Sequence, residues 1–233
     1  MYPHIKRFCD LIFALGGLLV TSPIVLLVII LKKLAGEKEI FYIKGRVGKG
    51  GRLFPFIKLS SMTPAKKGEK TSSLTLSNDS RITPLGHFIR KTKIDEFPQF
   101  VNIIRGELSF VGPRALMPKI HKDYTKEVKR ELSKIRPGVT GLATVVFRNE
   151  AQLLADSHHT DELKFYKEVI GPAKGAIEMI YTQNQSFILD LTILLLTVWQ
   201  IFRPQSLLGY KWLIYRGYIT PKEHSQLHRL FMI

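Results

Sequence analysis

The longest apolar stretch of the chain lies near its N-terminus and runs from Leu11 to Leu31 without a charged residue. Its 21 residues are enough for a helix that crosses the hydrocarbon core of a bilayer. The stretch is too long for the core of a signal peptide, and no small-x-small cleavage motif follows it. The pattern therefore predicts a membrane-embedded helix that is retained.

Two features favour a helix that enters the membrane and returns on the same side. Ser22-Pro23 lies at the centre of the stretch, and proline breaks or kinks a helix because it lacks an N–H and clashes with the preceding turn. The Ser22 hydroxyl can bond the carbonyl that Pro23 leaves free. Basic residues flank both ends and place both in the cytoplasm by the positive-inside rule. They are Lys6, Arg7, Lys32, Lys33 and Lys38. A kinked helix that crosses once is the alternative.

A second apolar stretch, Phe187–Phe202, is 16 residues long and contains Asp190, so it is a poor membrane span. On a helix, Asp190, Thr197 and Gln200 lie on one narrow side. We interpret the stretch as a helix in the membrane interface whose polar strip faces the protein or water. A buried core helix is the alternative, because periodicity does not separate the two.

Between these stretches the apolar pattern has shorter periods. Two strands, Ile40–Ile43 and Leu53–Leu59, are expected around a glycine-rich turn at residues 48–51. The other predicted elements are helices at Leu85–Arg90, Phe97–Arg105 and His121–Lys134, and a strand at Leu142–Phe147. The whole pattern predicts an α+β fold that is predominantly helical, with a re-entrant helix-break-helix, interfacial amphipathic helices and a small β-hairpin.

Charge and composition indicate the class of partner. The chain has 35 Lys and Arg against 19 Asp and Glu, which gives a net charge of +16 and a pI near 9.9. An anionic partner is expected: nucleic acid, acidic lipid or a phosphorylated substrate. A hydrophobic fraction of 45% excludes a disordered basic tail, and the single cysteine, Cys9, excludes a disulfide scaffold. The sequence has no helix-turn-helix, RNP or zinc-finger pattern, so nucleic acid is not expected.

The densest group of reactive side chains is the segment Thr92–Gln99, TKIDEFPQ, in which Asp95 and Glu96 stand side by side. Helix capping is one interpretation, since Thr92 with Asp95 fits the S/T-x-x-D pattern and acids suit a first turn. Pro98 weakens it, because a helix that began at Thr92 would already need the N–H that proline lacks. The other interpretation is catalysis, with one carboxylate as nucleophile and the other binding a metal or positioning it.

Cations gather around this acid pair in the sequence. They are Lys58, Arg81, Arg90, Lys91, Lys93 and Arg105. Gly112-Pro113 predicts a tight turn that can aim Arg114 and backbone N–H groups at a phosphate, although a solvated surface is the usual place for a single arginine. Residues 45–51 lack the spacing of a phosphate-binding loop. His158-His159 is expected in a surface loop and not in a zinc site.

Five motifs, in this order and at this spacing, resemble the bacterial sugar transferase family, the monotopic phosphoglycosyl transferases that begin surface-glycan assembly. They are the apolar segment with Ser22-Pro23, Lys58-x-x-x-Met62, Arg90-x4-Asp95-Glu96-x-Pro98-Gln99, Val111-Gly112-Pro113-Arg114, and Arg136-Pro137-Gly138-x-Thr140-Gly141-Leu142-Ala143. The resemblance covers residues 4 to 203, approximately. In it, Ser22 and Pro23 match the break of a re-entrant helix.

The resemblance implies a reaction and roles for residues. Such enzymes move a sugar-1-phosphate from a UDP-sugar to polyprenyl (undecaprenyl) phosphate and release UMP, which begins exopolysaccharide, lipopolysaccharide or other glycoconjugate synthesis. Asp95 matches the nucleophile that forms a covalent phospho-sugar intermediate, and Glu96 matches its partner. A magnesium ion bound near Asp95 would shield the pyrophosphate. Residues implied to bind substrate are Lys58, Arg90 and Arg114, with Arg46, Arg81, Gly112 and Pro113.

The resemblance also implies an organisation and a location. We expect a re-entrant membrane segment at residues 1–36, a cytosolic catalytic domain at 37–186, an interfacial amphipathic helix at 187–206 and a C-terminal tail at 207–233. The expected location is the cytoplasmic face of a bacterial inner membrane, where anionic lipids suit the charge of +16. The oligomeric state is left open.

The chain departs from the family pattern at a few positions, and two other functions are weighed against the transferase. Ser60 stands where the family commonly has Arg, Ala115 where it has Pro, and Thr144 where it has Gln. These changes leave the preferred sugar open and do not touch Asp95 or Glu96. The alternatives are a membrane-anchored basic scaffold without enzymatic activity and a membrane phosphohydrolase that uses water as acceptor.

Overall fold

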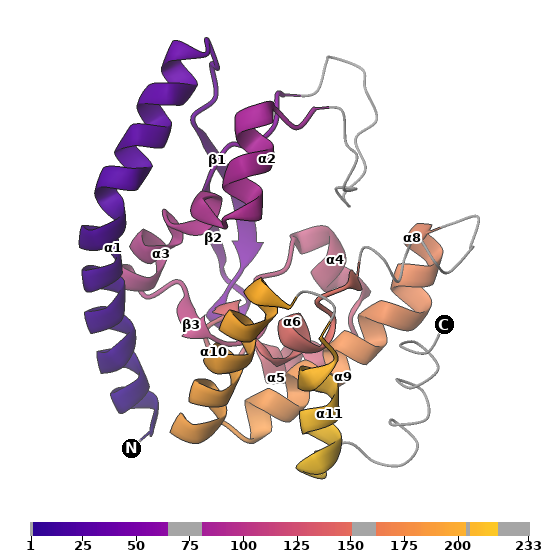
Figure 1. Ribbon diagram of the computed structural model, residues 1–233. Helices are drawn as coiled ribbons and strands as arrows, with labels where there is room; N and C mark the ends of the chain where they lie inside the picture. Colours follow the sequence, from indigo (N-terminus) through magenta and orange to yellow (C-terminus); the bar gives the residue numbers. More distant parts are fainter. Residues whose placement is uncertain (1, 65–80, 151–161, 204–205, 219–233) are drawn as a thin grey trace.

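The computed structural model describes residues 2–64, 81–150, 162–203 and 206–218, and in these parts the chain is mostly helical. A single long helix lies along one side of the molecule (Figure 1). A β-hairpin and short helices pack beside its upper half, and a cluster of helices packs beside its lower half. The predominantly helical prediction and the small hairpin are confirmed.

Helix α1, Tyr2–Leu34, is 33 residues long and is apolar enough to cross a membrane by length and composition. It runs through Pro23 without interruption, so the predicted break is wrong. The Ser22 hydroxyl donates to the Leu19 carbonyl at 2.9 Å, which is the carbonyl that the missing Pro23 N–H leaves free. The predicted Ser22 bond is thereby confirmed, and α1 bends halfway along without breaking (Figure 1).

One face of α1 is fastened to the rest of the molecule along its whole length. Near its start, Arg7 donates to the carbonyls of Ile103 and Ile104 at 2.6 and 3.0 Å. Near its end, the fully buried Lys32 bonds the Ser60 carbonyl at 2.7 Å and pairs with Glu37. Arg7 and Lys32, counted above as flanks of a membrane segment, are therefore internal partners of the fold.

The opposite face of α1 exposes apolar side chains from one end to the other. They include Ile5, Phe8, Ile12, Phe13, Leu15, Leu19, Val20, Ile24, Leu26, Leu27, Ile30, Leu31 and Leu34. So large an exposed apolar surface marks a contact with lipid or protein. The path of α1 relative to a membrane stays a prediction.

The hairpin pairs β1, Phe41–Val47, with β2, Leu53–Leu59, in an antiparallel register from Phe41↔Leu59 to Val47↔Leu53. The strand β1 extends four residues beyond its predicted end. Its turn contains the 3₁₀ segment η1, Lys49–Gly51, where Gly50 and Gly51 adopt φ of 69° and 73°. This left-handed backbone favours glycine.

The helices after the hairpin only partly match the prediction. Helix α2, Pro84–Lys91, and helix α3, Gln99–Ile104, occur where the sequence predicted helices. The single helix predicted from His121 to Lys134 is wrong. The chain forms α4, Pro118–Asp123, and α5, Lys126–Leu132, because the Thr125 hydroxyl caps a new helix by accepting from the Val128 N–H.

A parallel pair of short strands links the two halves of the molecule. Strand β3, Ser109–Val111, pairs with β4, Gly138–Thr140. The strand predicted at Leu142–Phe147 is wrong: the chain forms helix α6, Leu142–Val146. A short apolar run is compatible with either a buried strand or a buried helix. Nearly every residue of this run is buried, so its pattern shows neither the period of a strand nor that of a helix.

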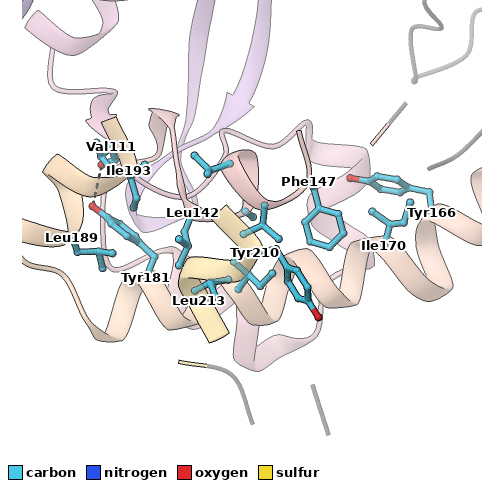
Figure 2. Close-up of a cluster of buried hydrophobic side chains, with 14 residues drawn as sticks. Val111, Leu142, Phe147, Tyr166, Ile170, Tyr181, Leu189, Ile193, Tyr210 and Leu213 are labelled. Atoms are coloured by element: carbon cyan, nitrogen blue, oxygen red, sulfur yellow. Dashed lines mark hydrogen bonds between the residues drawn. The ribbon is translucent and has the colours of Figure 1, made fainter. Parts of the chain in front are cut away.

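The main core lies among α6 and the C-terminal helices. These are α8, Glu162–Phe165, the π-helical turn η3, Tyr166–Ile170, α9, Gly171–Gln183, α10, Phe187–Phe202, and α11, Leu208–Tyr215. Figure 2 shows buried side chains of this core, including Leu142, Ile170 and Tyr181, together with Tyr210 and Leu213 of α11. The first part of the C-terminal segment is therefore packed into the core.

Helix α10 has the predicted bounds, and its polar strip faces the protein. Asp190 is buried, the Thr197 hydroxyl shares a hydrogen bond of 2.7 Å with the Thr140 hydroxyl, and Gln200 donates to the Val145 carbonyl at 2.7 Å. The other side of α10 exposes large apolar side chains. They include Phe187, Ile188, Leu191, Leu195, Val198, Trp199, Ile201 and Phe202.

Candidate active site

Asp95 and Glu96 lie on a short 3₁₀ segment, η2, Ile94–Glu96, between α2 and α3. The preceding residue, Lys93, adopts φ of 61°, a left-handed conformation that is uncommon for a residue other than glycine. The Thr92 hydroxyl donates back to the Phe88 carbonyl at 2.9 Å, and η2 has no side-chain cap. The capping interpretation of this segment is therefore wrong, and the acid pair is available for another role.

Lys58 of β2 joins the two carboxylates. Its Nζ lies 2.8 Å from Glu96 Oε1 and 3.6 Å from Asp95 Oδ2, so it hydrogen-bonds Glu96 and acts on Asp95 through charge alone. Asp95 is 8% exposed, and its Oδ1 has no hydrogen-bond partner among the described residues. The site thus holds one carboxylate with a free oxygen beside another that is engaged.

The two carboxyl groups differ in how readily they ionise. Burial raises the pKa of Asp95 above its ordinary value, against the attraction of Lys58, and the charge of Glu96 adds to the rise. Burial acts in the same direction on Glu96, but the charges of Lys58 and Lys93 outweigh it and hold the pKa of Glu96 below its ordinary value. Environments that push two carboxyl pKa values apart give the two groups different chemical roles.

Two arginines form a cationic group beside this site, with Arg114 near Glu96 and Arg46 near Arg114. Arg46 of β1 stacks on the Phe56 ring at 5.3 Å, and its buried Nε has no hydrogen-bond partner among the described residues. Burial lowers the pKa of Arg46, and the nearby charge of Arg114 lowers it further. Arg114 is exposed, and its charge also helps to lower the pKa of Glu96. Two guanidinium groups that repel each other form a site suited to an anion.

The structure places the predicted substrate-binding residues unequally. Lys58 contacts both acids, the charge of Arg114 acts on Glu96, and the charge of Arg90 acts on Asp95. Arg46 lies near Arg114 and stacks on Phe56. Arg81 lies beside the isolated bridge between Met62 and Ile82, and its backbone carbonyl accepts from the Thr63 N–H at 2.9 Å.

Gly112 and Pro113 form the turn that presents Arg114, and the Arg136–Ala143 motif holds this turn by backbone contact. The Gly112 N–H donates to the Thr140 carbonyl at 3.0 Å, and the Gly138 N–H donates to the Pro113 carbonyl at 2.8 Å. A Cβ on Gly138 would lie 2.1 Å from the Gly112 nitrogen, and one on Gly141 would lie 2.1 Å from the Gly112 oxygen. Any side chain at these positions would separate the two motifs, so they form one structural unit.

One buried acid of this unit is missing from the sequence-based prediction. Glu178 of α9 is 3% exposed, and its Oε1 accepts a hydrogen bond of 2.9 Å from the Arg114 backbone N–H. The sequence analysis predicted no helix at residues 171–183. A usable signal was present, because Glu178 is the only acid in the run AIEMIY, and a lone acid in an apolar helix needs a partner.

The carboxylates of the site could hold a magnesium ion only together with waters and substrate phosphates. The described residues contain no group of three or more His, Cys, Asp or Glu side chains that could hold a metal. His158-His159 lies outside the described residues. Mg²⁺ is commonly held by one or two carboxylates together with waters and substrate phosphates, and the free Oδ1 of Asp95 is compatible with that mode.

A family model and several similar proteins point to the same family. The model of the family "Bacterial sugar transferase" matches residues 1–204. Galactosyl transferase CpsE of Streptococcus agalactiae serotype III is 38% identical over 160 residues, which are 64% of this chain and 35% of that protein. The uncharacterized sugar transferase EpsL of Bacillus subtilis is 34% identical over 194 residues, 83% of this chain and 85% of that one.

A third relative carries a more specific name. The UDP-glucose:undecaprenyl-phosphate glucose-1-phosphate transferase of Klebsiella pneumoniae is 32% identical over 204 residues, 86% of this chain and 41% of that protein. This chain thus spans about a third of CpsE and less than half of the Klebsiella protein, but most of EpsL.

Proposed function

Because the chain belongs to the bacterial sugar transferase family, we propose that it transfers a sugar-1-phosphate from a UDP-sugar to undecaprenyl phosphate and releases UMP. The names of the Klebsiella relative and of the Aeromonas hydrophila UDP-N-acetylgalactosamine-undecaprenyl-phosphate N-acetylgalactosaminephosphotransferase support this substrate class. Related exopolysaccharide production proteins from rhizobia support a role at the start of exopolysaccharide synthesis. A comparable role in lipopolysaccharide synthesis follows from the same chemistry.

The observation that carries the mechanism is the free oxygen of Asp95 beside Lys58. In the first step, Asp95 Oδ1 attacks the phosphorus that bears the sugar, and the bond from that phosphorus to the oxygen of UMP breaks. The enzyme then holds an aspartyl phospho-sugar, and UMP leaves with the bonding electrons. In the second step, an oxygen of undecaprenyl phosphate attacks the same phosphorus, and the Asp95 carboxylate is restored.

The surrounding cations address the main barrier to this chemistry, the approach of a carboxylate to a diphosphate. Lys58 and Arg114 place positive charge at the acid pair before substrate binds, and Arg46 adds to it beside Arg114. Preorganised charge of this kind stabilises the transition state without reorganisation. Glu96 accepts a hydrogen bond of 2.8 Å from Lys58, whose Nζ lies 3.6 Å from Asp95 Oδ2.

We further propose that the enzyme uses Mg²⁺, which the Asp95 carboxylate would hold together with the phosphates of the nucleotide sugar. When bound, the ion supplies charge that offsets the developing negative charge on the diphosphate. The residues of the chain position the phosphates, through Arg46 and Arg114, and keep Glu96 ionised, through Lys58.

We propose that both ends of α1 lie on the cytoplasmic side, so that the helix enters one leaflet only. Its contacts from Arg7 to Lys32 extend over about 38 Å of helix at 1.5 Å per residue. This exceeds the hydrocarbon thickness of about 30 Å. If α1 crossed the bilayer, the charged body fastened along it would have to enter the hydrocarbon region. Anionic lipids of the cytoplasmic leaflet suit the charge of +16.

Labelling tests this topology. In a Cys9→Ser background, single cysteines at His4 and at Glu39, both exposed, are treated with a membrane-impermeant maleimide from either side of sealed vesicles. We expect both positions to react only from the cytoplasmic side. Reaction of one position from the opposite side would show that α1 crosses the membrane.

Product analysis tests the reaction. The purified chain is incubated with Mg²⁺, undecaprenyl phosphate and a panel of UDP-sugars, and UMP release is measured together with the sugar phosphate that enters the lipid phase. We expect equal amounts of UMP and lipid-linked product with at least one sugar. Sugar phosphate in the aqueous phase alone would indicate a phosphohydrolase, and no turnover would indicate a non-enzymatic scaffold.

The covalent step has its own test. Without lipid acceptor, the peptide that contains Asp95 should gain the mass of the sugar phosphate, and UMP should appear in a stoichiometric burst. An adduct on Glu96 would reverse the roles of the pair. Formation of lipid product without any adduct would indicate direct transfer.

A further inference from the structure

Glu178 lies against the turn that presents Arg114. Its Oε1 accepts from the Arg114 backbone N–H at 2.9 Å, while the Arg114 side chain is exposed. The carboxylate therefore fixes the backbone of the residue whose guanidinium points outward. A backbone N–H held by a buried anion is a strong, directional restraint.

The second oxygen of Glu178 is in an unusual position. Oε2 is buried and has no hydrogen-bond partner among the described residues. It lies 3.7 Å from the site where a Cβ on Gly141 would be, next to the backbone junction of Gly112 and Gly141. A buried ionised carboxylate with one unsatisfied oxygen is unfavourable, and binding of a proton relieves the penalty.

Few charged or titratable groups among the described residues face the Glu178 carboxylate. Arg114 faces it from the turn, Lys174 faces it from its own helix, and Tyr124 lies near it from the end of α4. Lys174 is itself paired with Glu150 at 2.8 Å. Burial raises the pKa of Glu178 to about 7, against the hydrogen bond from the Arg114 N–H and the charges of Lys174 and Arg114. Arg114 is thus one of the groups that keep Glu178 ionised.

We propose that Glu178 is a positioning residue that sets the Gly112–Arg114 turn for the phosphates of the nucleotide sugar and takes up a proton when they bind. The inference rests on the proposed function. An anion at Arg114 offsets the positive charge that favours the Glu178 carboxylate, so the carboxylate becomes easier to protonate. The proton comes from solvent and forms an O–H bond at the carboxylate, and no bond of the protein breaks.

Calorimetry measures this coupling directly. The full chain carrying Asp95→Asn, which stops turnover, is titrated at pH 7.5 with the UDP-sugar that supports UMP release in the wild type. The titration is repeated in buffers of different ionisation enthalpy, and the dependence on buffer gives the number of protons taken up. We expect about half a proton per site, and none when Glu178→Gln is added. Glu168→Gln, an exposed acid just before α9, is the matched control and should retain the uptake.

Kinetics separates positioning from a merely structural role. In the wild type, KM for the UDP-sugar should rise about threefold to tenfold from pH 6 to pH 8, with kcat changing much less. Glu178→Gln keeps an oxygen that accepts from the Arg114 N–H, so its KM should stay near the wild-type value at pH 6 across this range. Glu178→Ala removes that acceptor and should lower kcat/KM about tenfold at every pH. Recovery by the Gln variant identifies the acceptor as the cause.

The outcomes distinguish this inference from the proposed function. Tight binding by the Asp95→Asn protein without proton uptake overturns the role of Glu178 and leaves the proposed transferase activity intact, even if the Glu178 variants fail to fold. Uptake that persists in a folded Glu178→Gln variant assigns the proton to another group and also overturns it. If no UDP-sugar of the panel binds or reacts, the proposed function fails, and this inference fails with it.

Discussion

Asp95 and Asp190 are both buried aspartates with a lysine nearby, but their carboxylates are bonded differently. Asp190 is 7% exposed, and both of its oxygens accept hydrogen bonds. Tyr2 and Lys6 donate to Oδ2, and Tyr181 donates to Oδ1 at 2.7 Å. Asp95 is 8% exposed, but its Oδ1 has no partner among the described residues and Lys58 Nζ is 3.6 Å from Oδ2.

The difference indicates what each carboxylate does. A buried polar group is normally satisfied, and a satisfied network rigidifies what it connects. Asp190 joins α1, α9 and α10 in this way, and Tyr181 extends the link toward β3 by lying 3.3 Å from the Val111 carbonyl (Figure 2). Asp95 leaves an oxygen without a partner among the described residues, and Asp190 does not. Burial and charge are thus similar at the two sites, and hydrogen-bond satisfaction separates a clamp from a reactive group.

Asp95→Asn is expected to have the largest effect on activity and tests whether Asp95 is the reactive group. The amide cannot attack phosphorus, so UMP release should fall at least about 10³-fold, or about 4 kcal/mol. Because Oδ1 has no partner to lose, the thermal midpoint should change little. Asp123→Asn, an exposed acid paired with Lys167 at 3.3 Å, is the control and should keep full activity. Substantial unfolding of Asp95→Asn would instead make Asp95 a structural residue like Asp190.

The reverse result is expected for Asp190→Asn. Loss of the charge weakens two bonds to Oδ2 and leaves Lys6 partly buried without its counter-ion, which should lower the free energy of unfolding by about 3 kcal/mol. The kcat of the protein that remains folded should stay within about threefold of the wild type. Denaturant unfolding in detergent and UMP release measure the two effects. A large loss of kcat with unchanged stability would remove the distinction between the two aspartates.

Lys58→Met tests a second difference between the two aspartates. Asp95 shares its lysine with another acid, Glu96. The substitution removes the cation beside Asp95 and leaves Glu96 without its 2.8 Å partner, so kcat should fall about 10²-fold. Lys44→Met, which removes an exposed lysine on the neighbouring strand, should change kcat less than threefold. Equal effects of the two variants in the UMP assay would mean that only the overall positive charge matters.

Glu178 is intermediate between the two aspartates, because one of its oxygens is bonded and the other is not. Burial raises the pKa of Glu178 to about 7, so between the ordinary carboxyl range and pH 7 the folded protein holds a proton that the unfolded chain has lost. Stability from this group is therefore present at low pH and is lost as pH rises through that window.

The expected size of this effect is about 2 kcal/mol between pH 5 and pH 8, below the limit of about 3 kcal/mol that the full shift would give. Glu178→Gln should abolish this part of the pH dependence, so its advantage over the wild type should grow toward pH 8. Unfolding curves at both pH values measure the difference. A wild type whose stability is the same at pH 5 and pH 8, relative to the Gln variant, would contradict the assignment.

Local patterns in the sequence predicted the elements that are defined by nearby residues. Helix α10 has the expected bounds and its polar strip meets the core, because Asp190, Thr197 and Gln200 repeat at helical spacing. The hairpin was predicted from its glycine turn. The acid pair was found because Asp95 and Glu96 are adjacent, and the structure adds that Lys58, 37 and 38 residues earlier, lies between them.

Contacts between distant segments account for what the sequence did not predict. The apolar run that begins at Leu142 is helical because Gly141 packs against Gly112 and the strand pairing ends at Thr140. Glu178 acquires its role from the backbone of Arg114, 64 residues away. The helix break expected at Pro23 is absent because the Ser22 hydroxyl satisfies the Leu19 carbonyl and the body supports α1 on both sides of the bend.

The bonds from Asp190 to the first turn of α1 have a consequence for biogenesis. Tyr2 and Lys6 are separated from Asp190 by 188 and 184 residues. At a synthesis rate of 5 to 20 residues per second, the ribosome adds Asp190 roughly 10 to 40 s after α1. Throughout this interval the first turn of α1 lacks its bonds to Asp190, and the exposed apolar face of α1 needs lipid or a chaperone to shield it. The fold is therefore completed from the C-terminal side, when the newly translated α10 brings Asp190 to the first turn of α1.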